Sequence, residues 1–401
     1  MLRRIRIKNF KLLRDVTLEF PKAATPTVLI GTNASGKSTV IEVLDFLSRC
    51  ATDGLNGALV AHGGMNAVRT IGAKGPIEIE SHWEFRVELV ETDWDLTWRF
   101  AIDAGPSGVP RLVAESLTDG GRGLVSTDEA GVRTVVDESE EGSQQLRDAA
   151  NFAFEKHVDE LRYSGLFWLR IVLSRLRVIG AFATAPAWAS VATNRLSPRD
   201  PVVISTEAFV GREGVGLANA LYNLHTEHAD AWALLERALR AEFPFVKRIV
   251  FPPDPGGSKI SFAIEDQRFS GRKIYASEMS DGMVVYLCLL ALIVQPNQIG
   301  VLALDEPDAH LHPSAVRRLL AIAASPSLRR NLIIVTHSNA LLDELRDPVA
   351  SIRIVESTPE GARIRQLDPA ALAAWRKDYT LSEMRRAGLL DPSNSSYGDE
   401  P

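Results

Sequence analysis

The stretch Gly31-Thr32-Asn33-Ala34-Ser35-Gly36-Lys37-Ser38-Thr39 decides the fold. Its first eight residues fit the pattern G-x-x-x-x-G-K-[ST], a glycine-rich loop whose backbone N–H groups surround phosphates. An apolar run over 27–30 precedes the loop, and apolar residues at helical spacing follow it. We therefore expect these nine residues to bind a nucleotide, with Lys37 on the β- and γ-phosphates and Ser38 on Mg²⁺.

A second motif is Val301-Leu302-Ala303-Leu304-Asp305-Glu306, an apolar strand that ends in two carboxylates. A buried parallel strand brings such residues to the sheet edge at which ligands bind in open α/β folds. Asp305 suits the coordination shell of Mg²⁺, and Glu306 can accept a proton from an attacking water. The alternative is a charge pair ahead of a helix that starts near Pro313.

Two further motifs follow the same logic. His337 comes directly after the apolar run 332–335, where it can contact a γ-phosphate or orient a water. Its alternative is a capping or packed histidine. Ser280-Asp281-Gly282 precedes an apolar helix from Met283, a pattern that suits an anion at a helix start and equally suits an ordinary helix cap.

Composition limits the class of protein. The chain has 401 residues, 45% hydrophobic residues and a net charge of −6, which indicate a globular protein without a surface coated in positive charge. The two cysteines, Cys50 and Cys288, are too far apart for a CxxC motif, and apolar neighbours predict a buried thiol at Cys288. The longest apolar run, Met283 to Val294, is too short to cross a bilayer. We expect a cytoplasmic protein with no membrane partner.

The patterning predicts four segments. Residues 1–103 hold the phosphate loop and an antiparallel β subdomain, since two alternating strands occur within 77–103. Residues 104–212 read as a mostly helical insertion, with acidic loops and hairpins over 115–141 and helix over 143–177. Residues 213–393 carry the remaining three motifs. Residues 394–401 are predicted to be a disordered tail.

The order of the four motifs resembles that of ABC-type ATPase heads of the SMC/RecF-like branch. More narrowly, the chain resembles the bacterial AAA family ATPases of short RecF- and OLD-like type. The matching pieces are Ile7 to Lys11, the phosphate loop, Gly214 to Leu224, the Ser280-Asp281-Gly282 segment, DEPDAHLHP over 305–313 and VTHS over 335–338. The resemblance covers residues 1–50 and 205–345.

The resemblance implies an α/β P-loop NTPase fold, an ABC/SMC-like head without a coiled-coil arm, that hydrolyses ATP to ADP and phosphate with Mg²⁺. It also implies a homodimer with ATP between the heads, in which Ser280-Asp281-Gly282 contacts the γ-phosphate bound by the other subunit. Asp308 would belong to the loop that crosses the dimer seam. His337 would sense the γ-phosphate.

Three departures from the family pattern concern rate and coupling between subunits. The family offers a glutamine to Mg²⁺ and water, but no glutamine precedes Gln144 here, so Arg69 to Gly72 would have to work without one. Val285 stands where the family often has arginine. The signature differs from LSGGQ.

Several functions stay open. A DNA-associated ATPase in repair or phage defence is one, and a regulatory ATPase that scaffolds a separate nuclease or toxin chain, encoded nearby, is the other. Residues 338–401 are too few for an appended nuclease domain, which is why an effector is expected on another chain. A transporter subunit is disfavoured by the long interval between Lys37 and Ser280.

Two patterns, one that looks like a metal site and one that looks like a DNA-binding surface, also have simpler structural explanations. Asp308, His310 and His312 alternate like metal ligands, but a loop before a helix start explains them better. The arginines at 162, 170, 175 and 177, with Phe167 and Trp168 among them, could form a DNA-binding surface. The alternative is an amphipathic helix with arginines whose stems lie along its apolar face.

Overall fold

The structure is a computed structural model. It describes residues 1–21, 25–87, 91–105, 108–139, 142–182, 184, 197–205, 208–252, 258–269, 271–296, 300–309, 311–325, 330–376 and 378–390. The expected tail over 394–401 lies outside these residues. Among the described helices, none is long and apolar enough to cross a membrane.

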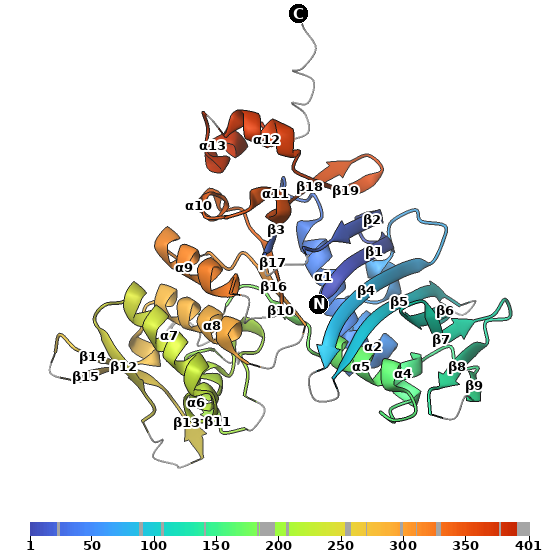
Figure 1. Cartoon of the computed structure of the whole chain (residues 1–401), viewed down its shortest axis with the longest axis horizontal. Helices are drawn as coiled ribbons and strands as arrows, with labels where there is room; N and C mark the ends of the chain where they lie inside the picture. Colours follow the sequence, from blue (N-terminus) through green and yellow to red (C-terminus); the bar gives the residue numbers. More distant parts are fainter. Residues whose placement is uncertain are drawn as a thin grey trace, which may run out of the picture.

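A largely parallel six-stranded sheet runs through the middle of the molecule (Figure 1). Its strands, in spatial order, are β10 (Arg177–Ile179), β16 (Val301–Asp305), β17 (Asn331–Val335), β3 (Thr27–Ile30), β18 (Ile352–Thr358) and β19 (Gly361–Gln366). All neighbouring pairs are parallel except β18 and β19. The expected buried strands at 27–30, 302–304 and 332–335 are thereby confirmed.

The middle of this sheet is buried on both faces, which is why β3, β16 and β17 are mostly uninterrupted apolar runs. On β16, Val301 and Ala303 belong to the hydrophobic core that includes α1 (Lys37–Thr52) and the antiparallel sheet. Leu302 and Leu304 belong to the other core, with α8 (Asp281–Val294) and α9 (Pro313–Ala323). Alternate residues of one strand therefore join the two halves of the molecule.

The second sheet is antiparallel and has eight strands. They are, in spatial order, β2 (Leu13–Glu19), β1 (Leu2–Phe10), β4 (Ile77–Val87), β5 (Thr92–Ala104), β6 (Pro110–Asp119), β7 (Arg122–Thr127), β8 (Arg133–Asp137) and β9 (Gly142–Leu146). Helices α2 (Gly54–Ala61) and α3 (Met65–Val68) follow α1 in the chain. The expected antiparallel pair within 77–103 is present as β4 and β5.

The segment 104–212 differs from the mostly helical expectation. Strands β6 to β9 continue the antiparallel sheet, and the described helices here are α4 (Ala153–Lys156), α5 (Ser164–Ser174) and the start of η1 (Arg212–Gly214). The strand β8 has alternating burial, but two of its three buried positions are Arg133 and Asp137. Because charged residues occupy interior positions, the sequence lacks the alternation of apolar and polar residues that identifies a strand.

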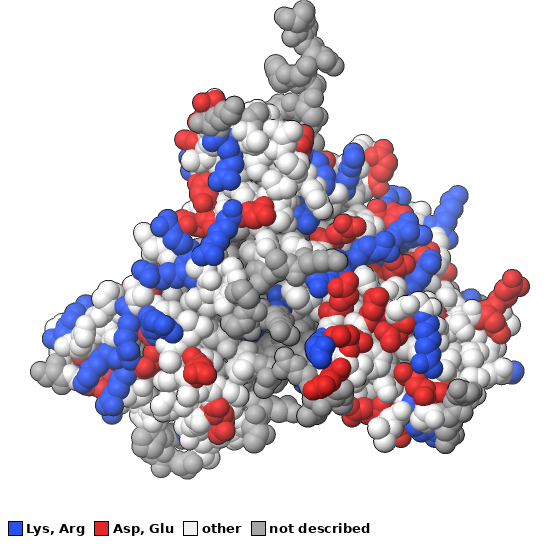
Figure 2. Space-filling model, in the orientation of Figure 1, with Lys and Arg blue, Asp and Glu red and all other residues white. Residues whose placement is uncertain are grey.

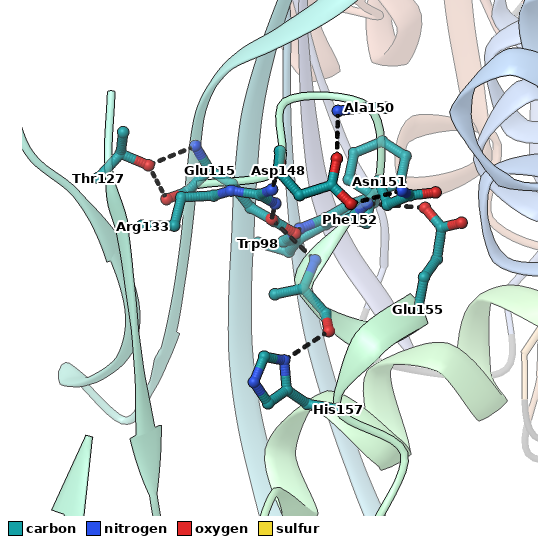
Figure 3. A network of polar contacts seen from close by, with 11 residues as sticks. Trp98, Glu115, Thr127, Arg133, Asp148, Ala150, Asn151, Phe152, Glu155 and His157 are labelled. Atoms are coloured by element: carbon teal, nitrogen blue, oxygen red, sulfur yellow. Dashed lines mark hydrogen bonds and ion pairs between the residues drawn. The ribbon is translucent and has the colours of Figure 1, made fainter. Parts of the chain in front are cut away.

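A buried polar network holds the charges of Arg133 and Glu115 in the interior (Figure 3). The carboxylate of Glu115 accepts hydrogen bonds from Arg133 Nη1 at 2.5 Å, Trp98 Nε1 at 3.2 Å and the backbone N–H of Ala153 at 3.0 Å. Arg133 also donates to the Asp148 carbonyl. Each buried charge has partners, which is the condition for keeping charge in a protein core.

The remaining elements form a lobe on the far side of the parallel sheet (Figure 1). In it lie α6 (Leu217–Glu227), α7 (Ala229–Glu242), β11 (Val202–Val203), β12 (Val246–Val250), β13 (Lys259–Ile260), β14 (Ala263–Asp266), β15 (Arg272–Tyr275) and η2 (Ala276–Glu278). The chain closes with α10 (Asn339–Asp343), α11 (Pro348–Ser351), α12 (Pro369–Trp375) and α13 (Leu381–Arg386). Both cysteines are buried and free, as expected for Cys288.

Candidate nucleotide-binding site

The glycine-rich loop connects β3 to α1, as the sequence predicts. Gly31 has φ +153°, and a Cβ there would lie 2.0 Å from the Val355 carbonyl oxygen of β18. Gly36 has φ +106° and is the N-cap residue of α1. Only glycine suits these two positions, because the first has no room for a side chain and the second is left-handed. The helix thus begins at Lys37 with its N-terminal N–H groups toward the loop.

The Lys37 side chain folds back over the loop. Its Nζ donates hydrogen bonds to the carbonyl oxygens of Thr32 at 2.7 Å and Gly31 at 3.1 Å. Burial lowers the pKa of this ammonium, as does the positive charge of Arg385, while Asp305 and Glu306 act in the opposite direction. Those carbonyls hold the ammonium beside the loop without a carboxylate bound directly to it.

Strand register brings the second and third motifs to the same edge of the sheet. Asp305 is paired with Val335 across β16 and β17, and Val335 is paired with Leu29 of β3. The residues that follow these three strands are Glu306, Thr336 and Gly31, so the phosphate loop, the carboxylates and His337 converge at the carboxyl ends of parallel strands. Asp305 accepts a hydrogen bond from the Ser38 side chain.

The two carboxylates have different environments. Burial is the main reason that the pKa of Asp305 is raised, and the neighbouring charge of Glu306 adds to this. Glu306 has φ +50°, a left-handed conformation that is uncommon outside glycine, and its backbone N–H donates to the Val335 carbonyl oxygen at 2.8 Å. Its side chain is 57% exposed and lies 3.7 Å from Nε2 of His337. The strained residue presents its carboxylate outward, where a reacting group can approach it.

A hydroxyl connects the loops after β16 and β17. Thr336 Oγ1 donates to Oδ1 of Asp308 at 2.8 Å and accepts from the backbone N–H of Ser338 at 2.9 Å. Ser338 then caps α10 through its own hydroxyl. These bonds fix His337, which stands between Thr336 and Ser338, relative to the loop that carries Asp308.

The Ser280-Asp281-Gly282 segment forms the N-terminus of α8, in the lobe across the parallel sheet (Figure 1). Ser280 caps the helix by accepting a hydrogen bond from the Met283 N–H. The buried Arg199 donates to Oδ1 of Asp281 at 2.6 Å and to the carbonyl oxygens of Ala276 and Met279 at 2.7 Å. The structure therefore shows the helix cap and adds an arginine that fixes the segment.

No strong pattern around Arg199 or Arg385 identified them in the sequence. Arg199 lies in an irregular segment, and Arg385 lies near the end of the chain in α13. Helix α13 packs on α10, the helix that follows His337, and the Ser382 N–H donates to Oδ1 of Asp343 at 3.0 Å. This packing explains how the charge of Arg385 reaches both Lys37 and His337, whose pKa values it lowers.

A cavity of about 490 Å³ opens beside the phosphate loop. It is lined by Ser35, Lys11, Leu12, Arg69, Ile71 and nine other residues, which come from the start of β2, from α3 and the segment after it, and from β18, β19 and the turn between them. Within the described part of the chain, the buried Oγ of Ser35 has no hydrogen-bond partner. A polar atom of this kind, at a loop of N–H groups, fits a phosphorylated ligand.

The metal-like spacing at Asp308 and His312 has a structural explanation. Asp308 accepts from Thr336, and His312 is the N-cap of α9, whose first residue is Pro313. His310 lies outside the described residues. Over the residues that the structure describes, no group of three or more His, Cys, Asp and Glu side chains could hold a metal ion. Ser38 and Asp305 remain a two-residue set of oxygen ligands, which fits Mg²⁺ shared with phosphates.

Residues 27–343 match the protein family described as "AAA domain, putative AbiEii toxin, Type IV TA system". The chain belongs to this AAA family. Residues 4–48 also match a second family described as "AAA domain". AAA families of this kind are ATPases that use nucleotides, so this chain is an AAA ATPase.

Two further comparisons found similar proteins. A segment of 96 residues is 36% identical to the DNA repair protein RecN of Xylella fastidiosa, and the match spans 23% of this chain and 16% of that protein. The crystal structure of an SMC head bound to the C-winged helix domain of ScpA has a TM-score of 0.51 and 13% identity. It covers 92% of this chain and 98% of that one. This likeness confirms the expected SMC-like P-loop fold.

Proposed function

We propose that this AAA ATPase binds ATP and Mg²⁺ at the phosphate loop and hydrolyses the ATP between two copies of the chain, in the cytoplasm. The observation that carries the proposal is the convergence of Lys37, Ser38, Asp305, Glu306 and His337 at one edge of the parallel sheet. Five residues from three separate parts of the sequence meet there. Each has the chemistry that phosphoryl transfer needs.

The loop N–H groups and the Lys37 ammonium bind the phosphates in this proposal. Ser38 and Asp305 hold Mg²⁺, which supplies charge neutralisation to the phosphates when bound. Glu306 takes a proton from the water that attacks the γ-phosphorus, as the bond from that phosphorus to the ADP oxygen breaks. His337 contacts the γ-phosphate. The cavity beside Ser35 has apolar walls at Leu12 and Ile71 that suit the nucleoside.

Dimerisation is supported by the family resemblance and by the form of the signature segment. The N-terminus of α8, with its N–H groups and Ser280, offers an anion-binding end. In a closed dimer, Ser280, Asp281 and Gly282 of one copy would contact the γ-phosphate held by the other. Arg199 supports this role because it holds Asp281 and the preceding carbonyl groups in place.

A role in DNA repair or phage defence is the wider function that we propose, supported by the similarity to RecN. The arginines at 162 and 177 give the DNA-linked role little support. Arg162 binds Asp137, and Arg177 donates to the Ser174 carbonyl and stacks on Phe209 at 4.4 Å. Arg162 and Arg177 lie just before and after α5, and their contacts support the interpretation that they stabilise the fold.

The second candidate is an ATPase that scaffolds a separate effector chain, without direct DNA binding. It is favoured by the family description, which names a toxin of a toxin–antitoxin system. Such a partner would respond to the ATP-bound dimer.

The test is the steady-state ATP turnover of the purified protein with and without duplex DNA, at two salt concentrations. Stimulation by DNA that weakens with salt supports the DNA-associated function, because phosphate contacts release counterions. A rate of ATP turnover that is the same with and without DNA favours the effector-linked function. No turnover in either condition, together with no ATP binding, would overturn the proposal.

A further inference from the structure

A group of basic residues lies on the three-stranded sheet of β12, β14 and β15. The basic hairpin surface consists of Lys247, Arg248, Arg268, Phe269, Arg272 and Lys273. All six are exposed, and Figure 2 shows Lys and Arg side chains gathered over this lobe. The chain as a whole has a net charge of −6, so this local excess of positive charge stands out.

Three of the five cations are held in place by carboxylates that lie beneath them, and a fourth, Arg272, lies 3.8 Å from the carboxylate of Glu278. Lys247 Nζ and Arg248 Nε donate to the two oxygens of Glu265 at 2.7 and 2.6 Å, and the Glu265 side chain is almost buried. Arg268 forms a two-point contact with the fully buried Asp266, at 3.0 and 2.7 Å. The carboxylates face inward, whereas more than half of each cation's side chain is exposed.

Backbone geometry produces this one-sided arrangement. A register shift between Val246 and Arg248 in the β12–β14 pair leaves Lys247 and Arg248 both exposed. Such bulges redirect side chains that regular alternation would place on opposite faces. At the hairpin between β14 and β15, Gly271 has φ +80°, a left-handed conformation that suits glycine in a tight turn.

Aromatic rings accompany the charges. The Arg268 guanidinium lies 4.2 Å from the ring centroid of Phe245 and 5.4 Å from that of Phe269. Phe269 is 58% exposed at the hairpin, and Tyr275, two positions after Lys273, is 44% exposed. Oriented cations beside exposed rings match a ligand that has both phosphates and flat bases.

We propose that the basic hairpin surface binds a single strand of nucleic acid, with its cations on the phosphates and Phe269 stacked on a base. The inference deepens the proposed DNA-linked function and rests on it for its biological role. It names a site on the lobe that carries the signature helix, separate from the phosphate loop. A strand bound there would lie on the same lobe as α8, the helix that is proposed to close on ATP.

The experiment measures binding of a fluorescent 30-nucleotide oligothymidine to the full chain without ATP, by anisotropy, at 50 and 200 mM salt. The double variant Arg272→Gln/Lys273→Gln removes two cations and leaves Glu265 and Asp266 with their partners. Its affinity should fall about 5- to 20-fold at low salt, and the slope of log K against log salt should decrease by about 1.4. Phe269→Ala should weaken binding about 5- to 100-fold with an unchanged slope.

The matched control is Arg86→Gln/Lys156→Gln. These two cations are also about half exposed and paired with carboxylates, but they lie in the first half of the chain, on β4 and α4. Its binding should equal that of the parent protein. Equal losses in the control, or full affinity in both test variants, would overturn the proposal.

Two other ligands test the assignment. The single-strand assignment would be overturned if a 30-base-pair duplex bound more tightly than oligothymidine and Phe269→Ala did not change the affinity for the duplex. Poly-glutamate that binds as tightly as oligothymidine would point to an acidic protein partner and overturn the proposal as well. ATP turnover without DNA should stay at the parent rate in both variants. Failure of the surface is thus distinguishable from failure of the ATPase assignment.

Discussion

Nε2 of His337 lies 3.7 Å from Oε1 of Glu306, at the ends of two neighbouring parallel strands. The imidazole is 41% exposed, so it contacts solvent while it lies near the Glu306 carboxylate and within the electrostatic influence of Lys37. Burial lowers the pKa of His337, Lys37 and Arg385 lower it further, and Glu306 opposes them. The lowered pKa favours the neutral imidazole, which can donate one hydrogen bond and accept another.

The titration of His337 tests this electrostatic arrangement. We expect an NMR titration midpoint below 6.5, raised by Arg385→Gln and lowered by Glu306→Gln, because the first removes a positive charge and the second a negative one. His337→Gln assigns the resonance. A midpoint at or above 6.5, or shifts of opposite sign, would contradict the arrangement.

The lowered pKa of His337 also has a consequence for stability. The unfolded chain binds this proton more readily than the folded protein does, since an unperturbed histidine has a pKa of about 6.5. The contribution of His337 to the free energy of unfolding is therefore complete above about pH 6.5 and declines as the pH falls towards the folded-state pKa. Urea unfolding of the parent and of His337→Gln across this range measures the effect. The difference between their free energies of unfolding should be constant above about pH 7, and the parent should lose stability relative to the variant as the pH falls below about 6.5.

Glu306→Gln should retain ATP binding and lose turnover by about 100- to 10,000-fold, because glutamine keeps the shape but cannot accept the proton. In the proposed mechanism the unhydrolysed ATP also keeps two copies together. Light scattering after size exclusion should show a dimer with Mg-ATP. Glu84→Gln, a carboxylate on the antiparallel sheet, is the control and should hydrolyse ATP normally. A Glu306→Gln protein that stays monomeric with Mg-ATP would remove the support for the sandwich.

Lys37→Ala should weaken ATP binding by at least about 30-fold, since it removes the charge held beside the phosphate loop. Isothermal titration calorimetry measures this directly. Lys156→Ala removes an exposed lysine elsewhere and should bind ATP like the parent. Unchanged affinity in Lys37→Ala would mean that the loop does not hold phosphates.

Gly31→Ala tests the contact between the loop and β18. The added Cβ would lie 2.0 Å from the Val355 carbonyl oxygen in a backbone conformation that alanine rarely adopts. We expect a loss of about 2 to 4 kcal/mol in the free energy of unfolding, together with loss of ATP binding. Gly123→Ala, where no atom lies within 4 Å of the new Cβ, should change stability by less than about 1 kcal/mol. Similar stabilities for the two variants would refute the steric argument.

Much of the fold could be predicted because its signals are local. The three buried strands β3, β16 and β17, the helix after the phosphate loop and the strands β4 and β5 each show the sequence pattern of their own secondary structure. The strands β6 to β9 lack that signal, since Glu115, Arg133 and Asp137 occupy interior positions and are satisfied by each other or by distant groups. Charged residues are usually exposed, so the sequence pattern predicted acidic loops with short hairpins, followed by a helix, where the sheet continues.

By itself, the sequence determined which residues could bind phosphate and metal, because each motif, the phosphate loop with Lys37 and the Asp305-Glu306 pair, consists of neighbouring residues. Only the tertiary structure decided which distant residues complete the site. Val355 lies against Gly31, Arg199 holds Asp281, and α13 brings Arg385 towards Lys37 and His337. The physical reason is that a glycine turn or a strand end is specified by a few neighbours. Steric contact and charge depend on distance in space, which the packing of both sheets and their helices sets.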